Sequence, residues 1–260
     1  MNTTSIHPLR QALNKVPEVT LLFWVIKMMA TTVGETAADF LNTRFQIGLT
    51  GTSLIMGALL AVALVLQVRT KRYAPPIYWL TVVLVSVVGT LITDNITDHF
   101  GVALAVSTGI FSAALLLVFA IWYLRERTLS IHHIDSVPRE LFYWLAILTT
   151  FALGTAAGDW FAETLKMGYG NAALLFGGAI ALVALVHYVF KADAVLSFWI
   201  AYILTRPFGA SLGDLLSQPH SNGGMGLGTT GTSALFLVTI VGLVGYLTFS
   251  ETRNEVQIEK

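Results

Sequence analysis

The chain has 260 residues, of which 12% are charged and 55% are hydrophobic, and its fifteen Lys and Arg balance its fifteen Asp and Glu. A soluble domain carries about 25% charged residues, so this composition predicts a membrane protein and excludes a disordered chain or a nucleic-acid-binding protein. The chain has no cysteine, which excludes disulfides, thiolate metal sites and thiol catalysis.

Eight segments are apolar over about 20 residues, the length that crosses a bilayer. In chain order they are residues 18–41, 48–68, 77–97, 102–124, 140–163, 170–190, 194–216 and 229–250. The first segment contains Lys27, Glu35 and Asp39, which a signal peptide would not carry. We therefore expect eight transmembrane helices.

Lys and Arg outside these spans are distributed unevenly. The loops after odd-numbered spans hold only Arg44 and Lys166. The N-terminal tail, the loops after even-numbered spans and the C-terminal tail hold eleven: Arg10, Lys15, Arg69, Lys71, Arg72, Arg125, Arg127, Arg139, Lys191, Arg253 and Lys260. Because positive loops stay on the cytoplasmic side, we expect both termini in the cytoplasm.

A repeated motif sets the architecture. An aromatic–Trp pair is followed ten residues after the Trp by Gly, and five residues later by Asp, in four copies. The Trp residues are 24, 79, 144 and 199, the Gly residues 34, 89, 154 and 209, and the Asp residues 39, 94, 159 and 214. Each copy contains two spans, so the repeats enter the membrane in the same orientation.

The motif divides the chain into repeats 18–72, 73–127, 138–192 and 193–250, with a cytoplasmic linker at 128–137 and a C-terminal tail at 251–260. We predict an all-α membrane protein in which four parallel two-helix repeats surround a central acid-lined cavity, in a pseudo-fourfold or two-plus-two arrangement. We favour packing as the role of the four Gly residues, and membrane-interface anchoring as the role of the four Trp residues.

The repeated aromatic–Trp, Gly and Asp unit resembles a family of bacterial membrane proteins built from four tandem two-helix repeats of unknown function. The resemblance covers residues 18–250. It implies a multi-pass protein of the bacterial inner membrane, and it implies no activity.

Charged residues within the membrane concentrate on the odd-numbered spans, and such groups are costly unless they face a partner, a cavity or a pathway. The acids are Glu35, Asp39, Asp94, Asp98, Asp159, Glu163 and Asp214. We expect the four repeat Asp residues toward the outer end and Glu35 nearer the middle of the membrane. We predict that these five residues bind a cation, with Asp98, Glu163, Thr31 and Thr32 as secondary candidates. Capping of helix ends is the alternative for each Asp.

Two basic residues also break the repeat. Lys27 has two interpretations, an ion-pathway residue and a side chain that reaches the cytoplasmic interface. Arg206 precedes Pro207, which should kink the seventh span. We expect Arg206 to act either as a moving part or as a fixed partner of Glu35.

We hypothesise a transporter for a divalent cation of the Mn²⁺ or Mg²⁺ type, or for a proton-coupled cation, because oxygen ligands favour hard ions. The alternatives are a cation channel and a non-transporting scaffold or receptor for a small polar ligand. Motifs of common enzymes are missing, so we expect no enzymatic activity and no covalent cofactor. The expected partners are the lipid bilayer, a small cation or polar solute, and further copies of the chain.

Overall fold

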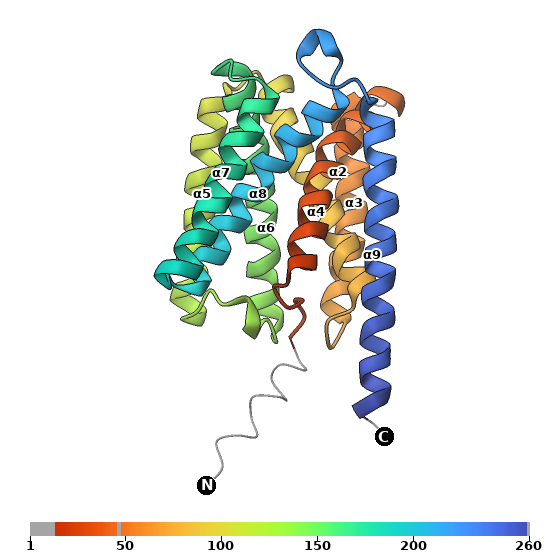
Figure 1. Ribbon diagram of the computed structural model, residues 1–260, viewed down its shortest axis with the longest axis vertical. Coiled ribbons are helices and arrows are strands. Elements are labelled where there is room, and N and C mark those ends of the chain that lie inside the picture. Colours follow the sequence, from red (N-terminus) through yellow and green to blue (C-terminus); the bar gives the residue numbers. More distant parts are fainter. Residues whose placement is uncertain (1–13, 46–47, 259–260) are drawn as a thin grey trace.

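The computed structural model describes residues 14–45 and 48–258, and in this part of the chain eight long helices run side by side (Figure 1). All eight are long and apolar enough to cross a membrane, as predicted. The helices are α2 (Leu21–Phe45), α3 (Gly48–Arg69), α4 (Pro75–Asp94), α5 (Leu104–Glu126), α6 (Val137–Asp159), α7 (Tyr169–Phe190), α8 (Ala194–Ser217) and α9 (Gly228–Ile258).

Helix ends follow ordinary sequence signals. Prolines occupy the first turns of α4 and α6, where the missing N–H has no helical acceptor. Asp193 caps α8 by accepting a hydrogen bond from the Leu196 amide, at 2.8 Å. α9 continues to Ile258, so it extends into the segment 251–260 that the sequence assigns to a C-terminal tail. Arg10 and Lys260 lie outside the described residues.

The first helices of the four repeats form a closed inner ring, in which α2 packs on α4, α4 on α6, α6 on α8, and α8 on α2. Between 56 and 67% of the hydrophobic stretch of each inner helix is buried, against 11–22% for α3, α5, α7 and α9. Each outer helix packs on the inner helix of the following repeat, and α9 closes the ring on α2. The odd-numbered spans, on which the charged residues concentrate, therefore form the centre of the bundle, and the even-numbered spans form its outer layer.

The four repeat glycines lie where neighbouring inner helices touch. A Cβ atom at Gly34 would overlap Ser86 of α4, and one at Gly89 would lie 2.5 Å from the Cβ of Phe151 in α6. Likewise, Gly154 lies against Arg206 of α8, and Gly209 lies against Thr31 of α2, so the last contact returns to the first repeat. The four contacted residues, Ser86, Phe151, Arg206 and Thr31, each follow the Trp of their own repeat by seven positions. Because the same contact recurs between each pair of neighbouring repeats, the ring is pseudo-fourfold.

Residues 14–20 lie at the end of the bundle where α2 begins and α9 ends, which we call the terminal end (Figure 1). Lys15 Nζ lies 2.7 Å from Glu140 Oε2 and donates a hydrogen bond to the Val68 carbonyl at 2.9 Å. The Lys15 amide donates to the Ile134 carbonyl at 3.1 Å. The segment thereby joins α3, the linker between the two halves and α6.

Candidate ion-binding site

The axis of the ring is built from five layers, each with one residue from every inner helix. Steps of four residues place side chains one above another on the same helix face. Counted from the terminal end, the first layer, which we call the aromatic layer, consists of Phe23, Tyr78, Tyr143 and Phe198, and the second consists of Lys27, Val82, Ile147 and Tyr202. The third layer consists of Thr31, Ser86, Phe151 and Arg206, and the fourth of Glu35, Thr90, Thr155 and Ala210. The fifth layer, which we call the Asp layer, consists of Asp39, Asp94, Asp159 and Asp214. All residues of the first four layers are buried, whereas three of the four Asp residues are partly exposed.

The aromatic layer is tightly packed across the ring. Tyr78 and Tyr143 are fully buried and join their hydroxyls in a hydrogen bond. Trp79, Trp144 and Trp199 are also buried, at 1–3% exposure, so the expected membrane-interface role is wrong for these three. They pack against the aromatic layer because each follows one of its members directly. Trp24 alone among the four is half-buried.

The second layer holds Lys27, whose side chain is fully buried, so the expectation that it reaches the interface is wrong. Its Nζ donates to the Tyr202 carbonyl at 3.1 Å and to the Thr205 hydroxyl. The ammonium also lies 4.2 Å from the centre of the Tyr202 ring and 5.0 Å from that of Phe151. No carboxylate of the described residues lies within ion-pair distance, and Lys27 joins α2 to α8.

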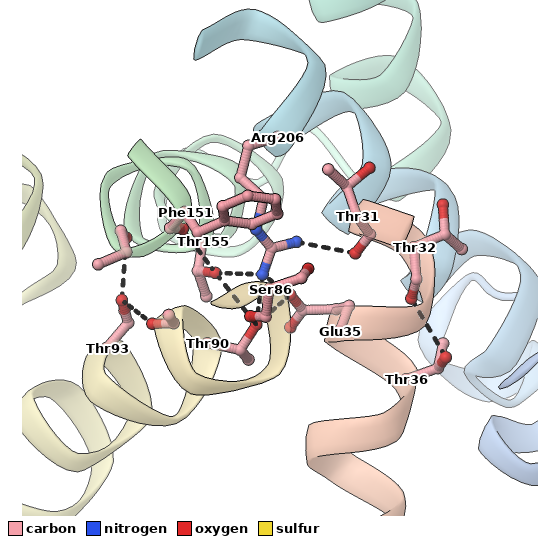
Figure 2. Close-up of polar contacts among 12 residues, drawn as sticks. Thr31, Thr32, Glu35, Thr36, Ser86, Thr90, Thr93, Phe151, Thr155 and Arg206 are labelled. Carbon is pink, nitrogen blue, oxygen red and sulfur yellow. Dashed lines mark hydrogen bonds and ion pairs between the residues drawn. The ribbon is translucent and has the colours of Figure 1, made fainter. Parts of the chain in front are cut away.

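Arg206 is fully buried in the third layer and contacts all the other repeats (Figure 2). Nη2 lies 3.0 Å from Glu35 Oε2, and Nη1 donates to the Thr31 carbonyl at 3.1 Å. Nη2 also donates to the hydroxyls of Thr155, at 2.7 Å, and Thr90. Arg206 is therefore the partner of Glu35, one of its two expected roles.

Three carboxylates converge above Arg206. One oxygen each from Glu35, Asp159 and Asp214 lies within 4.8 Å of the others, and these residues belong to the first, third and fourth repeats. We call this group the carboxylate cluster. Asp39 and Asp94 occupy the other two positions of the Asp layer without joining the cluster. The expected group of five thus divides into three that meet and two that lie beside them.

The secondary candidates lie around this cluster in different settings. Asp98 and Glu163 are exposed, on the π-helical turns Asn95–His99 and Trp160–Thr164 that directly follow Asp94 and Asp159. The hydroxyls of Thr31 and Thr32 both donate to the Met28 carbonyl of their own helix, and the Thr31 hydroxyl also donates to the Thr205 carbonyl of α8 at 3.4 Å. Thr31 reaches the site only through its backbone carbonyl.

Three residues of this site are not predicted from sequence as functional. Thr90 and Thr155 are the positional equivalents of Glu35, and their hydroxyls accept from Arg206. Phe151 is the equivalent of Arg206, and its ring centre lies 5.4 Å from the guanidinium carbon (Figure 2). The alignment of the four repeats could have identified these residues, because Phe151 and Arg206 both lie seven residues after their Trp, and Thr90 and Thr155 lie eleven residues after theirs, as Glu35 does.

The family model described as Repeat of Unknown Function (DUF347) matches residues 22–73, 77–128, 142–193 and 197–253. The chain belongs to this family. Its four matched segments each contain one inner and one outer helix, so the family unit is the same two-helix repeat that builds the ring. Comparison with curated proteins and with solved structures gives no match.

Proposed function

We propose that this family member is an integral membrane transporter for a hard divalent cation of the Mn²⁺ or Mg²⁺ type, with the carboxylate cluster as its binding site. The observation that carries the proposal is the convergence of Glu35, Asp159 and Asp214 from three repeats within 4.8 Å. Oxygens on opposite sides of one ion, with bonds of about 2.1–2.4 Å, lie about 4.2–4.8 Å apart. The separation therefore suits ligands of a single ion.

The charge balance at the cluster supports a cation as substrate. Three carboxylates in close contact repel one another, and Arg206 contacts only Glu35 among them by an ion pair in the described residues. A divalent cation bound between them would offset the two remaining charges. In a chain without cysteine, oxygen is the main available donor, which favours hard ions over soft ones.

The filled axis favours a carrier over an open channel. Three buried layers lie between the carboxylate cluster and the terminal end, and two of them contain the cations Lys27 and Arg206. A cation at the cluster is therefore blocked on one side by packed aromatic rings and positive charge. With the terminal end in the cytoplasm of an inner-membrane protein, as the positive loops indicate, this structure corresponds to a state closed toward the cytoplasm.

Flux into proteoliposomes tests this function. Purified protein is reconstituted with an Mn²⁺-sensitive dye inside, and initial rates are compared for wild type, Asp159→Asn and Asp214→Asn. We expect each variant to lose at least about tenfold in rate, because loss of one charged ligand removes at least about 1.4 kcal/mol of ion binding. Asp193→Asn is the matched control, since this exposed residue caps α8 and Asn caps equally well.

Two results would refute the proposal. One is rates for both cluster variants within twofold of wild type. The other is no Mn²⁺ or Mg²⁺ flux by wild-type protein that is shown to be folded and inserted. A channel would instead give flux that rises without saturation as the cation concentration increases.

A further inference from the structure

Glu35 belongs to two groups of contacts at the same time. It contributes an oxygen to the carboxylate cluster, and its Oε2 is 3.0 Å from Arg206 Nη2. Glu35 is 6% exposed and Arg206 is fully buried, so solvent screens this pair weakly. Of the three cluster carboxylates, only Glu35 has a basic side chain within ion-pair distance in the described residues.

Arg206 is held for this contact by atoms from all three other repeats. Thr31 supplies a carbonyl from the first repeat, and Thr90 and Thr155 supply hydroxyls from the second and third. The planar guanidinium of an arginine can donate to acceptors that lie in several directions, whereas the ammonium of a lysine is a compact point charge. The guanidinium thus lies among Glu35 of the cluster, the Thr31 carbonyl and the hydroxyls of Thr90 and Thr155 (Figure 2).

α8, the helix that carries Arg206, is continuous from Ala194 to Ser217 but lacks one internal hydrogen bond beside Arg206. Pro207 follows in α8 and has no N–H to donate to the Ile203 carbonyl, which weakens the helix at this turn. On the N-terminal side of this weakened turn, Lys27 fixes the turn Tyr202–Thr205 to α2. After it comes Asp214 of the cluster, so Arg206 and Asp214 lie on opposite sides of the weakened turn.

We propose that Arg206 is the internal counter-cation of the carboxylate cluster: it holds Glu35 while the site is empty and is displaced from Glu35 when a metal cation binds. Two cations that share one carboxylate repel each other, so binding of the metal weakens the Arg206–Glu35 pair, and the Arg206–Glu35 pair weakens binding of the metal by the same free energy. This inference rests on the proposed function, because it assumes that the cluster binds a cation. It makes Arg206 a positioning residue that lowers the affinity of the site.

The test is calorimetric titration of the detergent-solubilised full chain with Mn²⁺. Arg206→Gln removes the competitor, and we expect binding about 10- to 150-fold tighter than wild type, the range of a lost hydrogen bond to a charged group. Arg206→Lys keeps the charge but loses the fork, and we expect binding about 3- to 10-fold tighter. Lys166→Gln, in the exposed loop before α7, removes a positive charge elsewhere and should stay within twofold.

Thr155→Val provides a variant that keeps every charge and nearly the same shape. It removes one acceptor of Arg206, so we expect Mn²⁺ binding about threefold tighter, as about 0.7 kcal/mol of a single contact would give. This variant decides the question if Arg206→Gln does not fold. A merely structural role for Arg206 would lower the affinity in all three variants, whereas competition raises it.

The outcomes separate the two proposals. If wild type binds Mn²⁺ and Asp159→Asn abolishes binding, but the three competitor variants bind with unchanged or weaker affinity, the role of Arg206 is refuted and the transport site stands. If wild type binds neither Mn²⁺ nor Mg²⁺, both proposals are refuted. Tighter binding in Arg206→Lys and Thr155→Val supports displacement specifically, because neither variant changes the charge of the site.

Discussion

Replacement of Gly89 by alanine tests the close packing of the ring independently of any function. A Cβ atom at this position would lie 2.5 Å from the Cβ of Phe151 and 3.2 Å from the backbone nitrogen of Ala152. Carbon atoms in contact prefer about 3.5–4.0 Å, so α4 and α6 must separate by about 1 Å. The obstacle is backbone and Cβ rather than the flexible end of a side chain, and therefore it cannot rotate away.

The expected cost is that of overpacking a core, about 1–3 kcal/mol. For a protein of this size each kcal/mol changes Tm by about 2–4 °C, so Gly89→Ala should melt about 2–12 °C below its control. The control is Gly178→Ala in α7, where a Cβ would meet nothing within 4 Å. Alanine stabilises a helix relative to glycine by up to about 1 kcal/mol at both positions, so this term cancels between the two variants.

The measurement is thermal unfolding in detergent, followed by circular dichroism or by loss of the monodisperse peak in size-exclusion chromatography. Equal melting temperatures for Gly89→Ala and Gly178→Ala would refute the reasoning, because they would show that α4 and α6 are not in contact at this glycine. A deficit in Gly89→Ala alone supports the pseudo-fourfold ring.

Two further predictions concern the terminal end and the orientation of the chain. Lys15→Met leaves the buried Glu140 carboxylate without its partner and should cost about 3–5 kcal/mol in thermal unfolding. Arg139→Gln breaks two partly exposed ion pairs, with Glu126 and Asp135, and should cost about 0–1 kcal/mol for each pair. Equal losses in the two variants would contradict this expectation. Because the chain has no cysteine, Ser221→Cys should react with an impermeant maleimide in intact cells and His132→Cys only after lysis. The opposite labelling pattern would reverse the proposed orientation.

Much of this fold is predictable from sequence because its signals are local and repeated. Hydropathy alone locates the eight helices, and the spacing of Trp, Gly and Asp places equivalent residues at equal depth. The pairing of Glu35 with Arg206 remains one of two expectations at that stage, since 171 residues separate them and their contact depends on closure of the ring. The Lys15–Glu140 pair, 125 residues apart, has no sequence signal beyond two charges near span ends.

The tryptophans show how a sound general rule fails locally. Trp near the end of a span is ordinarily an interface anchor, and the sequence offers no sign that Trp79, Trp144 and Trp199 differ. Trp199 is covered by the linker and an outer helix, since it donates to the Leu129 carbonyl of the linker at 2.9 Å and packs edge-on against Trp122 of α5. Trp79 donates to the Tyr73 hydroxyl at 3.0 Å, and Trp144 packs against Tyr78 of α4. Such coverage is a property of the assembled bundle.

The closure of the ring by its first and last repeats also has a consequence for synthesis. α2 leaves the ribosome with Lys27, Glu35 and Asp39, and it is the least apolar of the eight spans. Arg206 on α8, the charge partner of Glu35, is synthesised 171 residues later, which takes about 9–34 s at 5–20 residues per second. The outer helix that packs on α2, α9, is synthesised after α8. The first span must therefore be retained by the insertion machinery, or by early contact with α4, until the last repeat arrives.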